Sequence, residues 1–328
     1  MIIRKLCATV TAFPTVTIAL ATVFGTVGFD AIHSNSASAQ EAAADSSAAE
    51  SDASSPSAES RFAAKETEVP SPIDLENAAV TYPRAVTVDG DKKYIVDLDL
   101  PGIWVQTDES SKVFTPGTKL LRKAMNRPWC VAVHPAGGLL IGDSATREIY
   151  HAKESGTKLI ALNGGYLGIP MALAVDSEGN QVYVGDAERR AVFRLPIGGG
   201  KPELVARVNA RGLSFDSEGN LWAITPDADA VVKIDVSKNS AETVVGDRPY
   251  QFPNGLVWAG EEGFVTDGYG KAIWRFTADG KTEKWFEGEP LQSPVGISVD
   301  ENYLYVADPR SKQVYRFDRK DKSVEPIL

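Results

Sequence analysis

A short pattern recurs six times in the last three-quarters of this 328-residue chain. In the plainest copy, Val182-Tyr-Val-Gly-Asp186 is followed seven residues after its aspartate by Phe193. Successive copies lie 46, 43, 39, 42 and 41 residues apart. The six anchor pairs are Asp97 with Trp104, Asp143 with Tyr150, Asp186 with Phe193, Thr225 with Val232, Asp267 with Trp274, and Asp308 with Tyr315. A period near 40 residues with several strand-like runs in each copy is typical of a β-propeller.

Each copy contains four runs of β-branched and aromatic residues, bounded by turns rich in glycine, asparagine and serine. We therefore predict an all-β fold over residues 80–328: one six-bladed β-propeller of four-stranded antiparallel blades. Residues 323–328 are expected to form the last outer strand. How the ring closes is left open: residues 67–80 could add a strand to the last blade, although Pro70 and Pro72 disfavour it.

The first 39 residues have the order of a secretory signal peptide. Arg4 and Lys5 precede an apolar run over residues 6–29, and Ala37-Ser-Ala39 then supplies the small residues of a cleavage site. The run is long enough that an uncleaved membrane anchor is the alternative. The sequence thus predicts an exported protein, periplasmic or secreted, which touches a membrane only through this segment if it is retained.

Residues 40–79 form a linker of unusual composition. The first 27 of them are nearly all alanine, serine, glutamate and aspartate, and the whole linker holds nine acids and two bases. Such a segment buries too little apolar surface to offset the entropy of ordering it, so we predict an acidic, disordered linker. It accounts for most of the net charge of −10, so the acidity says little about a ligand. No basic footprint for nucleic acid is present.

The cysteine count excludes an internal disulfide in the mature chain. Only Cys130 remains after cleavage within the signal peptide. A propeller of this size has a large core and needs no such crosslink. Because its strand neighbours are apolar, Cys130 is expected to be a buried small hydrophobe rather than a nucleophile.

The motifs resemble two related groups of propellers. The pattern Pro-x-Gly-hydrophobic-x-Val-Asp, followed by Tyr-Val-x-Asp and Ile-x-Arg, resembles the NHL repeat. The stretch Phe252-Pro-Asn-Gly-Leu-Val-Trp258 with Phe264-Val-Thr-Asp267 is similar to the senescence-marker-protein and gluconolactonase family and its strictosidine-synthase-like relatives. The resemblance covers roughly residues 82–328. It implies a six-bladed propeller and, in the lactonase-like relatives, a metal-dependent hydrolase.

A set of aspartates ends the second strand of five blades, and these residues invite a metal interpretation. Each belongs to a different blade and precedes a turn, where a carboxylate accepts backbone N–H bonds. We therefore expect structural roles for them, with Thr225 as a weaker substitute in the fourth blade. His134 is expected to replace an aspartate as a turn cap at the end of a first strand. The strand-end aspartates are Asp97, Asp143, Asp186, Asp267 and Asp308.

The informative position is the residue just before the small residue that opens each inner strand. The small residues allow the inner strands to pack closely around the propeller axis. We therefore expect the residue before each small residue to lie at the mouth of the central channel. In blade order this ring position holds Arg84, Trp129, Met171, Arg211, Asn254 and Val295. Guanidinium groups suit carboxylate or phosphate, and an indole offers a stacking face. The alternative is that both arginines pair with loop carboxylates and Trp129 merely plugs the axis.

Two functions follow from this ring. The resemblance implies that Asn254 would be a metal ligand, but Val295 stands where a partner aspartate is expected. Divalent cations such as calcium or zinc, the candidate cofactors, want several oxygen ligands and are repelled by arginines. The sequence thus favours a non-catalytic, monomeric propeller that binds an unidentified small molecule, peptide or carbohydrate of anionic character. A gluconolactonase-like hydrolase with an altered metal site is the alternative, and no catalytic residue is assigned.

Overall fold

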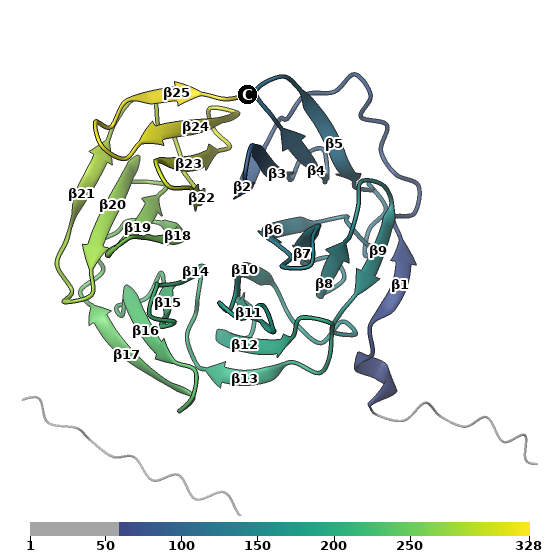
Figure 1. Cartoon of the computed structure of the whole chain (residues 1–328), viewed down its shortest axis with the longest axis horizontal. Coiled ribbons are helices and arrows are strands. Elements are labelled where there is room, and N and C mark those ends of the chain that lie inside the picture. Colours follow the sequence, from purple (N-terminus) through teal and green to yellow (C-terminus); the bar gives the residue numbers. More distant parts are fainter. Residues whose placement is uncertain (1–58) are drawn as a thin grey trace, which may run out of the picture. The chain divides into compact units, whose positions relative to one another are not determined.

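The structure, a computed structural model, describes residues 59–328; the predicted signal peptide and the first part of the predicted linker lie outside this range. Six antiparallel sheets surround a central channel, which confirms the predicted six-bladed propeller (Figure 1). The described residues include no helix that is long and apolar enough to cross a bilayer.

The first three blades run outward from the channel in strand order. Blade 1 contains β2 (Pro83–Asp89), β3 (Lys92–Asp97), β4 (Gly102–Gln106) and β5 (Ser111–Pro116). Blade 2 contains β6 (Pro128–Val133), β7 (Leu139–Asp143), β8 (Glu148–Ala152) and β9 (Lys158–Ala161). Blade 3 contains β10 (Pro170–Val175), β11 (Gln181–Asp186), β12 (Ala191–Pro196) and β13 (Glu203–Ala206).

The last three blades repeat this plan. Blade 4 contains β14 (Gly212–Phe215), β15 (Leu221–Ile224), β16 (Val231–Asp235) and β17 (Ser240–Val245). Blade 5 contains β18 (Pro253–Ala259), β19 (Glu262–Asp267), β20 (Ala272–Thr277) and β21 (Thr282–Glu287). Blade 6 contains β22 (Gly296–Val299), β23 (Tyr303–Asp308), β24 (Gln313–Asp318) and β25 (Val324–Pro326), so the chain end does form the last outer strand.

The segment before blade 1 differs from the prediction. After a short 3-10 helix, η1 (Ser60–Phe62), strand β1 (Lys65–Glu68) adds a fifth strand to the outer edge of blade 2, pairing with β9. Residues 67–80 therefore add no strand to the last blade, and the disordered linker predicted over 40–79 does not extend through β1. The outer edge of β9 has unpaired backbone N–H and C=O groups. Hydrogen bonds to these groups order β1 although its polar side chains bury little apolar surface.

The ring closes by packing rather than by a shared strand. Inner strand β2 of the first blade packs beside β22 of the last, and each of these two blades takes its strands from one continuous part of the chain. The Ile327 N–H donates to the carbonyl of Val314, and Ile327 and Leu328 pack on a cluster shared by blades 6 and 1. The two ends of the propeller sequence are thus joined by side-chain burial.

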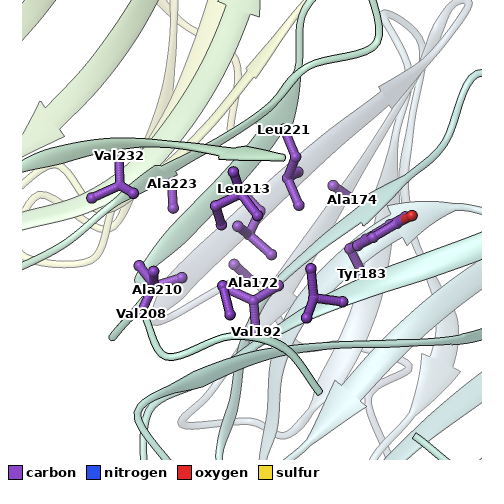
Figure 2. Close-up of a cluster of buried hydrophobic side chains, with 13 residues drawn as sticks. Ala172, Ala174, Tyr183, Val192, Val208, Ala210, Leu213, Leu221, Ala223 and Val232 are labelled. Atoms are coloured by element: carbon purple, nitrogen blue, oxygen red, sulfur yellow. The ribbon is translucent and has the colours of Figure 1, made fainter. Parts of the chain in front are cut away.

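The hydrophobic core lies between the blades, with one cluster in each of the six interfaces. In β11, Tyr183 packs in the cluster between blades 3 and 4, whereas Val182 and Val184 pack toward blade 2. Successive strand residues point to opposite faces, so a strand buried on both faces needs an unbroken apolar run. Figure 2 shows the interface of blades 3 and 4, where alanines and valines let the two sheets approach closely.

The strand-end aspartates are structural, as predicted. All five are at most 1 % exposed. Asp186 accepts the N–H groups of Gly168 at 2.6 Å and Ile169 at 3.1 Å, in the connection to the inner strand, and that of Arg189 at 3.0 Å in its own turn. In blade 4, Thr225 accepts one N–H from Asp227, within its own turn. Each carboxylate thus ties the connection that enters a blade to the turn between its second and third strands.

Removal of one such carboxylate should destabilise the whole ring. The Asp186→Ala substitution leaves at least three backbone N–H groups without their acceptor, two of them in the connection to the inner strand. We expect a loss of about 3 kcal/mol in the free energy of unfolding. Thr225→Ala removes one accepted and one donated hydrogen bond, both uncharged and both within one turn, and should cost only about 1–2 kcal/mol. Urea unfolding of both variants measures the difference, and equal losses would contradict this account.

His134 caps its turn as predicted, because its Nδ1 accepts the N–H of Ala136 at 3.0 Å. His151 in β8, whose third-strand position predicts a surface or groove residue, is buried and lines a groove, and its ring stacks on His134 with centroids 3.7 Å apart. The Nε2 of His151 lies 3.0 Å from the carbonyl of Gly137. Burial lowers the pKa of both rings, and repulsion from His151 lowers that of His134 further.

This pair should make folding sensitive to mild acid. Below the unfolded histidine pKa of about 6.5, the unfolded chain binds protons that the folded state resists, so stability falls as pH drops from 7.5 to 5. The double variant His134→Asn/His151→Gln keeps an acceptor for the Ala136 N–H and removes both titrating groups. Its melting temperature should change less over this range than that of the wild type. An unchanged slope would show that other groups cause the acid sensitivity.

Candidate functional site

The structure brings all six predicted ring residues to one central channel. They line a cavity of about 80 Å³ together with the two residues that follow each of them in the inner strands. In four blades the ring residue sits where the pairing register shifts, as between Pro83 and Ala85 in β2. A β-bulge leaves one residue without a cross-strand partner and re-aims its side chain. The bulge thus explains why these residues point into the channel.

The small residues beside the ring position allow this crowding, as the sequence predicted. A Cβ on Gly212 would lie 2.6 Å from the backbone nitrogen of Leu256, and one on Gly296 would lie 2.6 Å from the Cα of Ala85. Such contacts are too close for a side chain, so neighbouring inner strands meet backbone to backbone. The channel is therefore narrow, and only the ring position brings large polar groups into it.

Arg84 is the most unusual residue of the channel. It is only 7 % exposed, and no described residue forms an ion pair or a hydrogen bond with its guanidinium. Its guanidinium carbon lies 5.0 Å from the ring centroid of Trp129, a cation–π contact. Burial, together with the charge of Arg211, lowers the pKa of Arg84 to about 10 despite the opposing effects of Cys130 and Tyr82. Arg84 therefore stays protonated at neutral pH.

Two further donors in the channel lack acceptors. Trp129 Nε1 and Arg211 Nε are both buried without a hydrogen-bond partner in the part of the chain that the structure describes. Burial also lowers the pKa of Arg211, against the attraction of Asp227. Asp227 is paired with Arg190 at 2.7 Å instead. The alternative in which loop carboxylates neutralise the two ring arginines is therefore not the arrangement observed.

The other ring residues make the remaining wall mostly apolar. Met171 and Val295 are buried, and Asn254 donates from Nδ2 to the carbonyl of Phe252 at 3.1 Å, which leaves its Oδ1 as the acceptor side of the amide. Cys130 donates from Sγ to the carbonyl of Pro170 at 3.4 Å. Burial raises the pKa of Cys130 to about 12 although Arg84 opposes the shift. Cys130 is thus a protonated, buried thiol at neutral pH, as predicted.

A divalent cation does not fit this donor set. The channel lining holds two guanidinium groups and no carboxylate, and Asn254 is its one amide side chain. Nowhere in residues 59–328 do three His, Cys, Asp or Glu side chains gather as metal ligands would. Because calcium needs six to eight oxygen ligands and zinc prefers imidazole, thiolate or carboxylate, Asn254 alone could not hold either ion.

Metal binding by the channel can be measured directly. We expect neither calcium nor zinc to raise the melting temperature of the full chain, since a bound ion stabilises by mass action. The Asn254→Ala variant should respond to both metals as the wild type does. A metal-dependent rise that disappears in Asn254→Ala would instead demonstrate a metal site at the mouth.

The face around the channel entrance carries one strongly basic connection. This mouth face carries the starts of the inner strands, the connections between blades, and the turns that follow the strand-end aspartates. The connection 117–127 holds four bases, Lys119, Arg122, Lys123 and Arg127, and no acid. On the opposite face, turns 176–180, 216–220 and 300–302 each hold two acids and no base. The 117–127 connection therefore forms a local basic patch on the mouth face.

Exposed apolar side chains also gather on the mouth face, and sequence reasoning missed most of them. Phe252, expected at the rim, is 42 % exposed and stacks on Tyr269, which is 69 % exposed, with centroids 4.5 Å apart. Leu120 and Leu121 are exposed in the connection that enters blade 2. The position of Tyr269 in the sequence could have predicted its place on this face. It comes two residues after the strand-end aspartate Asp267, and the turns that follow these aspartates lie on the mouth face.

The fold and channel define this chain as a six-bladed β-propeller with an arginine-bearing channel mouth. No family model matches the chain, and no curated protein is similar enough to match it. Similar solved structures include a chain of a nidogen–laminin complex, with 17 % identity, a TM-score of 0.61, and coverage of 70 % of this chain and 90 % of that chain.

Two further similar structures have a TM-score of 0.58 and cover 81 % of this chain. They are virginiamycin B lyase from Staphylococcus aureus, with 14 % identity over 88 % of that chain, and a putative gluconolactonase, with 16 % identity over 94 % of that chain. At such identities the likeness establishes the shared propeller fold alone. The expectation of a gluconolactonase-like fold is confirmed.

Proposed function

We propose that this chain is an exported, non-catalytic propeller that binds an anionic small molecule, peptide or carbohydrate at its channel mouth. The observation that carries the proposal is the pair of ring arginines that form no ion pair with a carboxylate of the described residues, one of them, Arg84, buried. Two unneutralised cations in a narrow, mostly apolar channel favour a negatively charged group. The N-terminal order of charged, apolar and small residues supports export.

The size of the cavity indicates how such a ligand would lie. Ligand pockets for drug-sized molecules are roughly 300–1,000 Å³, far larger than the channel. A ligand of that size would therefore rest across the mouth face and insert only a small group. The stacked rings of Phe252 and Tyr269 offer it an apolar surface, and the bases of the 117–127 connection attract an anion.

The absence of a suitable base or nucleophile supports a binding role over an enzymatic one. The channel lining has no histidine, aspartate or glutamate, and its one thiol, Cys130, is held protonated. General acid–base catalysis needs a group that titrates near the working pH. A lactonase of altered mechanism is the second candidate, favoured by Asn254 in the channel and by the putative gluconolactonase among the similar structures. Lactone hydrolysis that Asn254→Ala abolishes would establish it.

Binding to an array of acidic and neutral peptides and oligosaccharides tests the proposal. We expect the full chain to retain the acidic members selectively. Arg84→Gln/Arg211→Gln should weaken that binding by about 100-fold or more, because each of the two lost charged hydrogen bonds contributes about 1.5–3 kcal/mol. Arg147→Gln is the matched control, since Arg147 lies on the same face and is already paired with Glu188 at 3.0 Å. Equal retention by all three proteins, or a preference for neutral members, would contradict the proposal.

A further inference from the structure

The channel concentrates hydrogen-bond donors that form no hydrogen bond with the described residues. The Arg84 guanidinium, Trp129 Nε1 and Arg211 Nε all belong to residues of its lining, and none has a partner among residues 59–328. Buried polar groups are nearly always paired in folded proteins, so each exception needs a physical explanation. Three unpaired donors at one cavity, two of them on cations, point to a shared acceptor that carries negative charge.

The stacking of Arg84 on Trp129 leaves the guanidinium available to a ligand. The guanidinium carbon lies over the indole ring at 5.0 Å, and this contact uses none of the guanidinium N–H groups as hydrogen-bond donors to a described residue. These N–H groups form the fork that matches two oxygens of one anion. The contact therefore holds Arg84 in place without using its hydrogen bonds.

The dimensions of the cavity limit the anion. About 80 Å³ exceeds the 10–15 Å³ that a single water needs, but it is far below the volume of a ligand pocket. The buried side chains of Met171 and Val295 close the wall with apolar groups, which strengthens the electrostatic attraction inside. A compact group with two or more oxygens fits this space, and a whole sugar ring or an aromatic amino acid does not.

We propose that the channel binds one compact oxyanion on the Arg84 guanidinium, the Arg211 Nε–H and the Trp129 indole N–H. The oxyanion is the carboxylate of a larger ligand or free inorganic phosphate. This inference rests on the proposed function in that it names the group by which the mouth recognises its ligand. In the ligand-free protein, Arg84 is then a buried, unpaired charge that lowers the stability of the fold and is retained for anion binding.

Thermal unfolding with acetate and phosphate as probes tests the inference. The full chain is titrated with each sodium salt in a buffer whose own anions are bulky sulfonates. We expect a rise in Tm of roughly 5 °C at about 100 times Kd. Acetate alone raising Tm assigns the carboxylate, and phosphate alone raising it assigns phosphate.

Arg84→Met is the decisive variant. It should abolish the anion-dependent rise and, without added anion, melt at a higher temperature than the wild type, because an unpaired buried charge has been removed. Trp129→Phe keeps a ring beneath Arg84 but removes the N–H donor, so it should weaken anion binding roughly tenfold. It provides the test if Arg84→Met does not fold. Arg147→Gln should respond as the wild type, which separates binding from ionic screening.

The outcomes separate this inference from the proposed function. No rise in Tm, or the same rise in Arg84→Met or Trp129→Phe as in Arg147→Gln, would mean that water alone satisfies the donors and would overturn the inference. Selective retention of acidic array members could still stand in that case, with recognition on the mouth face. Conversely, an Arg84-dependent rise with an array that shows no acidic preference would support the anion site and contradict only the proposed function.

Discussion

Each blade of this propeller depends on how the chain enters it, and in five blades a buried carboxylate fixes that entry. Asp308 accepts the N–H groups of Gln292 and Ser293 from the entering connection, and those of Arg310 and Ser311 from its own turn. These hydrogen bonds fix the position of the connection relative to the sheet and so determine where the inner strand begins. The ring position lies at that start, so the same hydrogen bonds that stabilise the blade also position the channel side chains.

The fourth blade departs from this arrangement at the place where Arg211 enters the channel. Thr225 donates to the carbonyl of Asp229 and accepts the N–H of Asp227, both within its own turn. A hydroxyl is too short to hold the entering connection as well, and the Oδ1 of Asn209 in that connection is buried without a partner. The entry beside Arg211 thus lacks the strand-end carboxylate of the other five blades, and Asn209 Nδ2 ties it to the turn by donating to Asp227 Oδ2 at 3.4 Å.

The fold could be predicted from the sequence because the same local pattern of strand, turn and small residues recurs in six copies. Runs of β-branched and aromatic residues in the strands, small residues at the crowded axis and carboxylates at strand ends are all local patterns, and all were confirmed. The attachment of β1 to blade 2 was missed because strand pairing at an outer edge joins residues about 90 positions apart, as Glu68 and Lys158. The stacking of His151 on His134 was not foreseen for a related reason, since His134 lies in the turn after β6, 17 residues earlier in the chain than His151.

The sequence alone determined which residues would meet at the channel, because ring geometry sends the same position of every repeat to the same axis. Only the tertiary structure decided what those residues do there. The sequence shows the charge, the size and the aromatic character of Arg84, Trp129 and Arg211, but it does not show which groups they contact. Whether a guanidinium is neutralised depends on which acceptors lie within a few ångströms, and those come from other blades. The folded ring places Asp227 on Arg190 and leaves the channel donors unpaired, and that arrangement is the basis of the anion site that we propose.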